Sequence, residues 1–342
     1  MCYNLKWNKM AHYGLNTKKE QRMKITAEKI FKSPIAVVVF ALICTALWGS
    51  ATPFIKLGYQ YTGISDGHVP SIILFAGTRF ILAGLLTIVI YSIARRKFLY
   101  PKLQNLGRIG LISAFQTVIQ YIFFYIGLAN TTGVKGAIAS GTSVFFSILV
   151  ASLIFKLEKL TVKKVLACII GFLGIIIVNL NGLDFTMNFL GDGFVLISAA
   201  ASGCAAVFIK LYSKHEDPVV ISGYQFFVGG IFMAIVGLIA GGRIELLSTG
   251  SILVLLYLGM LSAVAYSLWG VLLKYNSVAR VTIFSFMTPV FGTILSKIML
   301  SESSDVPLIN LIITLLLVCL GIFLINYQGK SKSQNLKGND NA

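Results

Sequence analysis

The stretch from Leu42 to Tyr59, LICTALWGSATPFIKLGY, occurs a second time as LISAAASGCAAVFIKLYS, from Leu196 to Ser213. At a constant offset of 154, nine of the eighteen positions are identical, and both copies keep a glycine, Gly49 or Gly203, and the run Phe-Ile-Lys-Leu. Internal repeats in a long apolar chain are typical of membrane transporters built from two related halves, with a substrate site between the halves near the bilayer midplane.

The composition predicts an all-α integral membrane protein. Apolar residues make up 56% of the 342 residues and charged residues only 12%, against about 25% charged residues in soluble domains. A hydrocarbon core of about 30 Å is crossed by a helix of about 20 apolar residues. We expect ten such helices, at residues 35–58, 69–94, 107–129, 134–155, 162–180, 191–210, 219–241, 250–274, 279–300 and 307–327.

Ten helices and one repeat give a simple organisation. We expect a basic cytosolic tail at 1–33, a first five-helix repeat at 34–180, a second at 181–327 and a disordered cytosolic tail at 328–342. Because each half has an odd number of helices, the second half enters the membrane from the opposite side, so the repeats are inverted around a central cavity. Of the 29 Lys and Arg residues, 24 fall in segments on the side of the N-terminus. The positive-inside rule therefore predicts a multi-pass protein of the cell (plasma or inner) membrane with both termini cytoplasmic.

Several functions are disfavoured by the same sequence. The net charge of +17 follows from membrane topology and does not indicate nucleic-acid binding. The five cysteines form no Cys-x-x-Cys pair, and the three histidines fall outside the predicted helices. We therefore expect no disulfide, metal site or cofactor. An intramembrane enzyme would need a nucleophile or base with an orienting partner, and the predicted helices offer no such pair, so the protein is predicted not to be an enzyme.

The repeat extends beyond its best stretch. At an offset of 146, Arg79-Phe80 aligns with Gln225-Phe226, and the same offset aligns Thr142 with Thr288 and Phe145 with Phe291.

These features together resemble a known family. The pattern WGS-x-x-P-x-x-K from Trp48 to Lys56, the Arg79-Phe80 pair and a small-residue fourth helix that ends near Leu160 look like the EamA branch of the drug/metabolite transporter superfamily. The resemblance covers about residues 35–327. It implies two inverted five-helix units, a central cavity lined mainly by helices 1, 3, 4, 6, 8 and 9, and small organic solutes as cargo. The second half departs from the pattern, with Ala-Ala-Ser at 200–202 where the first half has Trp48 and its neighbours, so the two faces of a cavity would differ.

The function expected from this resemblance is secondary transport of a small organic solute, an amino acid or related metabolite, which is exported by alternating access. The alternatives are a multidrug or cationic compound exporter of the same fold, or a non-transporting membrane sensor or assembly subunit. The expected partners are the substrate and the lipid bilayer, with the protein a monomer or homodimer.

Polar residues inside the helices are the candidate substrate site. A charge at the bilayer centre costs about 2.5 to 3.5 kcal/mol on insertion scales, and no acidic residue in the middle of a predicted helix can neutralise Arg79. Arg79 could bind an anionic group of the substrate or donate to helix carbonyls. Gln116 and Gln120 share one helix face with Tyr121 beside them.

The predicted substrate-binding residues are Trp48, Arg79, Gln116, Gln120, Tyr121, Thr142, Gln225, Tyr266, Trp269 and Thr288. For the uncharged residues, interhelical hydrogen bonding or aromatic packing is an equally open interpretation. The predicted hinge and gating residues are Gly49, Pro53, Lys56, Gly203, Lys210 and Pro289.

Overall fold

The computed structural model describes residues 25–65, 67–180, 186–246, 248–300 and 307–326. Most of the predicted basic tail and all of the predicted C-terminal tail lie outside these ranges. Every regular element in the described residues is helical, which confirms the all-α prediction.

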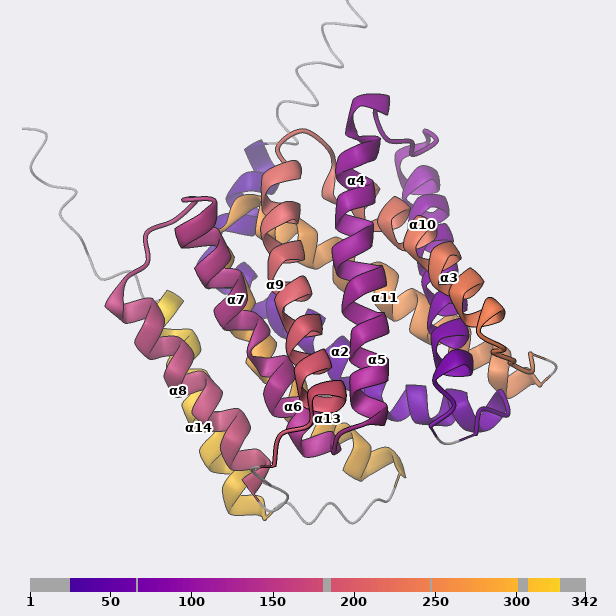
Figure 1. The fold of residues 1–342 in the computed structure, drawn as a ribbon. Helices are drawn as coiled ribbons and strands as arrows, with labels where there is room; N and C mark the ends of the chain where they lie inside the picture. The colour runs from indigo at the N-terminus through magenta and orange to yellow at the C-terminus, as the bar shows by residue number, and fades with distance from the viewer. Residues whose placement is uncertain (1–24, 66, 181–185, 247, 301–306, 327–342) are drawn as a thin grey trace, which may run out of the picture.

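The first half of the chain folds into five membrane helices, some built from several consecutive pieces (Figure 1). The elements are α2 (Pro34–Tyr61), α3 (Val69–Arg95), η1 (Leu103–Asn105), α4 (Leu106–Ile112), η2 (Ser113–Ile119), α5 (Gln120–Ala129), α6 (Gly133–Gly141), α7 (Ser143–Leu149), η3 (Val150–Ile154) and α8 (Val162–Val178). The elements of the second half are η5 (Phe189–Gly193), α9 (Phe194–Tyr212), α10 (Pro218–Ile239), α11 (Thr249–Tyr275), α12 (Val278–Thr282), η6 (Ile283–Phe286), α13 (Met287–Leu300) and α14 (Leu308–Asn326).

Among the described residues, nine helices are long and apolar enough to cross a membrane, and α8, with 17 residues, is a slightly shorter tenth. The four composite helices span Leu103–Ala129, Gly133–Ile154, Phe189–Tyr212 and Val278–Met299. Ten crossings put the start of α2 and the end of α14 on the same face, which we call the N-terminal face. The other is the opposite face.

Side chains and prolines at the helix starts explain the observed boundaries. Proline occupies the first turn of α2, α3 and α10, where its missing N–H costs no intrahelical hydrogen bond. Thr132, Thr161, Ser248 and Ser277 each accept a hydrogen bond from a backbone N–H of the helix that follows, which satisfies one of its free donors.

The helix contacts follow the repeat: when two helices pack together, their counterparts in the other half also pack together. Helix α3 packs on α10, and α8 packs on α14. In the first half, α2 packs on α11 and α13; in the second half, its repeat counterpart α9 packs on α5 and α7. This arrangement of two inverted five-helix repeats agrees with the predicted architecture.

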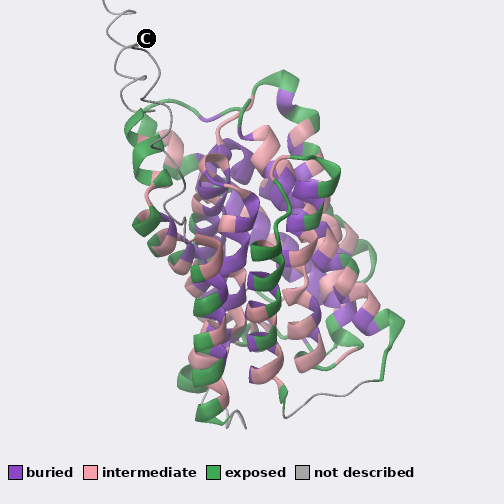
Figure 2. Ribbon diagram, turned by 90° about the vertical axis from the view of Figure 1, so that its left-hand side faces the viewer, coloured by how far each residue is buried: buried purple, intermediate pink, exposed green. Residues whose placement is uncertain are grey.

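The surface of the bundle is apolar along its length. Side chains such as Ile239 on α10 and Leu316 and Phe323 on α14 are exposed, whereas the buried residues concentrate between the helices (Figure 2). Exposed apolar side chains of this kind are stable in contact with lipid. The polar residues of interest therefore lie within the interior of the bundle.

Candidate functional site

Trp48 lies at the centre of the repeated stretch and contacts the facing half. Its ring centroid is 5.0 Å from that of Tyr266 and 4.8 Å from that of Trp269, both on α11. The neighbouring Gly49 has no side chain, so α2 can approach α13 closely: a Cβ atom there would lie 2.5 Å from the Cβ of Phe291. The first repeat thus places an indole against the second half at a close helix crossing.

From Trp48 the aromatic contacts continue through the interior. Tyr266 lies 4.7 Å from Phe226, Phe226 is stacked 5.0 Å from Phe80, and Phe80 lies 4.6 Å from Tyr121. We call this set the aromatic chain; it comprises Trp269, Trp48, Tyr266, Phe226, Phe80, Tyr121 and Tyr125. The hydroxyls of Tyr121 and Tyr266 are hydrogen-bonded at 2.6 Å, which links α5 to α11.

Arg79 lies beside this chain and is only 4% exposed. Its Cζ is 4.5 Å from the ring centroid of Phe80 and 5.8 Å from that of Tyr121. Its Nε has no hydrogen-bond partner, and no ion pair in the described part of the chain includes it. Within the described residues, the guanidinium is therefore held by aromatic contacts without a counterion.

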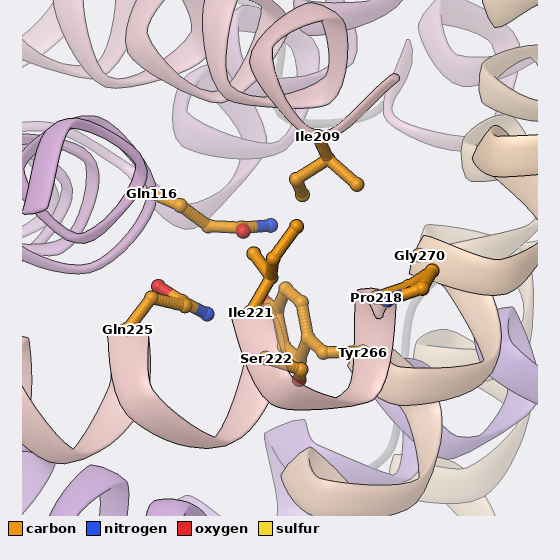
Figure 3. Close-up of a pocket in the computed structure, with 8 residues that line it drawn as sticks. All are labelled: Gln116, Ile209, Pro218, Ile221, Ser222, Gln225, Tyr266 and Gly270. Carbon is orange, nitrogen blue, oxygen red and sulfur yellow. The ribbon is translucent and has the colours of Figure 1, made fainter. Parts of the chain in front are cut away.

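A small hollow, with room for about one water molecule, lies next to Tyr266, between η2, α9, α10 and α11. The side chains of Gln116 and Gln225 line it from two helices and extend toward the same space (Figure 3). The remaining lining residues are Ile209, Pro218, Ile221, Ser222 and Gly270. Helix α10 contributes most of these, although the family resemblance implied a cavity lined mainly by helices 1, 3, 4, 6, 8 and 9.

The amide of Gln225 is only partly satisfied by the protein. Its Oε1 accepts a hydrogen bond of 2.7 Å from the Thr117 hydroxyl, while its Nε2 and the nearby hydroxyl of Ser222 have no partner. The backbone is fixed from the same side, because the hydroxyl of Ser113 donates to the carbonyl of Gln225 at 2.8 Å. Buried polar groups without partners are uncommon, and their presence here is typical of a site that receives water or a solute.

The structure brings together seven of the ten predicted substrate-binding residues, within or next to the aromatic chain and the hollow. The other three lie apart from these contacts. Gln120 is half-buried with an unpaired Oε1, Thr288 has an unpaired hydroxyl, and Thr142 donates to the Ala139 carbonyl of its own helix at 2.5 Å. Their roles in binding stay predictions.

Sequence reasoning missed the two phenylalanines in the middle of the aromatic chain. Phe80 and Phe226 are fully buried and stacked at an interplanar angle of 6°, one from each half. The aligned pairs Arg79-Phe80 and Gln225-Phe226 contained the signal, since equivalent residues on pseudo-symmetric helices that pack together meet near the axis.

The predicted hinge and gating residues have different surroundings in the two halves. Gly203 resembles Gly49, because a Cβ atom there would lie 2.7 Å from the Cβ of Phe146. Lys210 donates to the carbonyls of Lys274 (3.0 Å) and Asn276 (2.6 Å), whereas its repeat counterpart Lys56 is exposed. Pro53 is buried within α2, and Pro289 is half-buried in α13 with its carbonyl accepting from the Thr293 hydroxyl at 3.0 Å. A hinge or gating role for these residues stays a prediction.

Metal-ligating side chains do not gather in the described part of the chain. No group of three His, Cys, Asp or Glu residues there could hold a metal ion.

Comparison with known proteins gives a consistent result. A sequence model of the EamA-like transporter family matches residues 35–180 and 189–327. A WAT1-related chloroplastic protein of Arabidopsis thaliana is 24% identical over 292 residues, which cover 82% of this chain and 67% of that protein. An uncharacterized transporter of Archaeoglobus fulgidus is 26% identical over 271 residues, with 78% and 90% covered, and the uncharacterized transporter YvbV of Bacillus subtilis is 24% identical, with 84% and 90% covered.

One solved crystal structure has a TM-score of 0.69 to this chain at 16% identity, covering 86% of this chain and 97% of the other. At that identity the likeness concerns the fold alone.

Proposed function

We propose that this chain, which belongs to the EamA-like transporter family, is a secondary transporter that moves a small organic solute across the membrane by alternating access. The family match and the relatives named as transporters identify a multi-pass membrane transporter, not an enzyme. The cargo, direction and mechanism given below are our proposal.

The observation that carries the proposal is a set of aromatic rings and unpaired polar atoms contributed by both halves. Trp48 and Arg79 come from the first repeat, and Gln225 and Tyr266 come from the second. Buried atoms without a hydrogen-bond partner include Nε1 of Trp48, Nε of Arg79 and Nε2 of Gln225. A solute bound among these groups would contact both halves at once, so that a movement of one half against the other would change its access to the two faces.

The proposed mechanism is a rocking of the two halves about their close crossings. Gly49 and Gly203 allow α2 and α9 to lie against α13 and α7, and Pro53 interrupts the hydrogen bonding of α2. In our proposal these points, with Lys56, Lys210 and Pro289, act as hinges or gates while the solute stays bound between the halves.

We infer an amino acid or related metabolite as the cargo, with export as the direction. Amide and aromatic groups suit solutes that combine a flat apolar part with a polar group. The excess of Lys and Arg on the N-terminal face supports a location in the cell membrane with both termini cytoplasmic. A multidrug or cationic compound exporter, or a non-transporting sensor, remains the competing function, and either a monomer or a homodimer is compatible with this reading.

Counterflow in proteoliposomes tests the proposal. The full chain is reconstituted in vesicles loaded with the unlabelled form of the solute under test, and uptake of the labelled form is measured for each amino acid, nucleoside and organic cation of a panel. Saturable, trans-stimulated uptake is expected for at least one amino acid, with a higher KM in Trp48→Phe, which keeps a ring but loses Nε1.

Arg243→Gln is the matched control. It removes an exposed positive charge in the loop between α10 and α11, outside the set of aromatic residues. Uptake of organic cations alone would favour the multidrug function. Binding without any flux would favour the sensor.

A further inference from the structure

Arg79 is a buried cation, and no acidic residue in the described part of the chain forms an ion pair with it. The acidic residues that the structure describes lie elsewhere. Glu158, Glu216 and Asp217 are in loops of the N-terminal face, and Asp192 and Glu245 are at the opposite face. Because a buried charge without a partner is unfavourable, its presence calls for a compensating group.

The aromatic contacts of Arg79 compensate it only partly. Phe80 and Tyr121 offer ring faces to the guanidinium, at 4.5 and 5.8 Å. A cation–π contact stabilises the positive charge but accepts none of the five N–H groups, which point outward in the guanidinium plane. The hydrogen bonds of the described residues include none from Arg79 to a helix carbonyl, and Nε is unpaired. The alternative in which Arg79 serves as a link between helix backbones is therefore not supported.

The guanidinium and the phenol hydroxyls near it offer hydrogen-bond donors to an anion. Tyr121 lies beside the guanidinium, its ring is 5.9 Å from that of Tyr125, and its hydroxyl is hydrogen-bonded to that of Tyr266. Phenol hydroxyls can donate to a carboxylate, and the planar fork of an arginine side chain binds both carboxylate oxygens at once. A solute whose only charge is positive would meet a like charge in this region and no described acidic side chain.

We propose that the transport site selects solutes that carry a carboxylate, which Arg79 binds, and that it rejects solutes whose only charge is positive. This inference rests on the transport function proposed above and names the class of its cargo. The body of the solute lies against the aromatic chain. Since the repeat has Gln225 in place of a second arginine, the site provides one guanidinium and accommodates one carboxylate.

Three ligands of closely similar size separate carboxylate from amine recognition: L-phenylalanine, 3-phenylpropionate, which lacks the amine, and 2-phenylethylamine, which lacks the carboxylate. Thermal unfolding of the purified full chain is measured with each at millimolar concentration, because ligand binding raises the unfolding temperature even at modest affinity. Benzoate and acetate extend the set to smaller carboxylates. We expect stabilisation by carboxylates with an aromatic body and none by 2-phenylethylamine.

Arg79→Gln is expected to abolish the carboxylate response, with a loss of affinity of at least about tenfold for a charge-assisted hydrogen bond. Without ligand, this variant should unfold at the same or a higher temperature than the native chain, because it no longer buries an unpaired charge. A structural role for Arg79 would give the reverse, a lower ligand-free unfolding temperature. Arg79→Lys keeps the charge but not the bidentate geometry and should bind carboxylates weakly. Arg243→Gln should respond as the native chain does.

Stabilisation by 2-phenylethylamine, an unchanged response in Arg79→Gln, or no response to any carboxylate in the set would overturn the inference. The proposed transport function fails separately, when the counterflow panel shows no carrier-type uptake of any solute. A chain that transports nucleosides or organic cations and ignores carboxylates would keep its transport function and lose only the carboxylate site.

Discussion

Gly49 and Gly203 show at the scale of single residues why both copies of the repeated stretch have glycine at this position. At Gly49 an added Cβ would lie 2.5 Å from the Cβ of Phe291 and 2.8 Å from the backbone N of Gly292. At Gly203 it would lie 2.7 Å from the Cβ of Phe146 and 2.8 Å from the backbone N of Ser147. Side-chain and backbone atoms block the same position in both halves, so neither helix can accept a methyl group without moving.

We predict that Gly49→Ala and Gly203→Ala each destabilise the protein by about 1 to 3 kcal/mol, the usual effect of overpacking a well-packed interior. The measurement is thermal unfolding in detergent. Gly110→Ala is the control, since a Cβ there meets nothing within 4 Å and alanine is the better helix former. Equal unfolding temperatures for all three variants would mean that the α2 and α9 crossings are loose.

The sequence was enough to identify several residues of the candidate site, but not to predict which residues they contact. Polarity inside an apolar helix is enough to single out Arg79 and Gln225, because burying such groups is costly. The aromatic contacts of Trp48 depend on which face of α11 turns inward, and a nearly uniform apolar helix does not reveal that face. Thr142 illustrates the limit, since its hydroxyl is satisfied by the carbonyl of Ala139 in its own helix.

At the scale of helices, Lys210 near the end of α9 holds the end of α11. Its Nζ donates to the carbonyls of Lys274 and Asn276, which have no intrahelical partners at a helix C-terminus. We predict that Lys210→Met lowers the free energy of unfolding by about 1.5 to 3 kcal/mol, the range for hydrogen bonds to a charged group. Thermal unfolding again measures it, beside Lys214→Met as a control at an exposed neighbouring lysine. A Lys210→Met variant as stable as the control would show that water replaces these bonds without loss.

The repeat predicted two halves of the same plan, but not the register in which their helices pack. The sequence aligns Phe145 with Phe291, whereas in the structure Phe146 faces Gly203 as Phe291 faces Gly49. The helix that carries Phe291 contains the 3₁₀ turn η6, four residues long, whereas the helix pieces α6 and α7, which lead up to and include Phe146, contain no 3₁₀ turn. A 3₁₀ turn of that length adds roughly 80° of rotation and about 2 Å of rise over an α-helix, close to a shift of one residue.

This register difference has a consequence for the whole molecule: the two halves share a fold but differ in local conformation. Alternating access needs such a difference, because the halves exchange conformations when the open face changes. The internal repeat predicted the two-fold plan, and the count of apolar segments predicted the number of helices. The sequence could not predict which half holds which conformation, since that depends on small free-energy differences between packed states.

Contacts across the N-terminal face tie the two halves together. Glu216, before α10, accepts hydrogen bonds of 3.0 Å from the backbone N of Lys102 and from Nδ2 of Asn105. Glu158, after η3, accepts a 3.0 Å hydrogen bond from the backbone N of Ala279 in the first turn of α12 and pairs with Lys164 at 3.2 Å. Each carboxylate thus joins a loop of one half to the backbone or side chain of the other. Glu216 also lies two residues before Pro218, which lines the hollow.

We predict that Glu158→Gln and Glu216→Gln open this face. The hollow is probed by the rate at which a water-soluble maleimide modifies Ser222→Cys, in a chain whose native cysteines are replaced. If each carboxylate contributes about 1 kcal/mol to the closed arrangement, its loss should raise the modification rate about fivefold, with Glu158→Gln the larger effect because its partners are less exposed. Glu245→Gln, at the opposite face, should leave the modification rate unchanged. High salt should reduce the effect of Glu216→Gln on the modification rate before it reduces that of Glu158→Gln, because exposed charges are screened more than buried ones. Unchanged rates in both variants would mean that apolar packing alone closes the N-terminal face, and that the proposed gate lies in the α2 and α9 crossings instead.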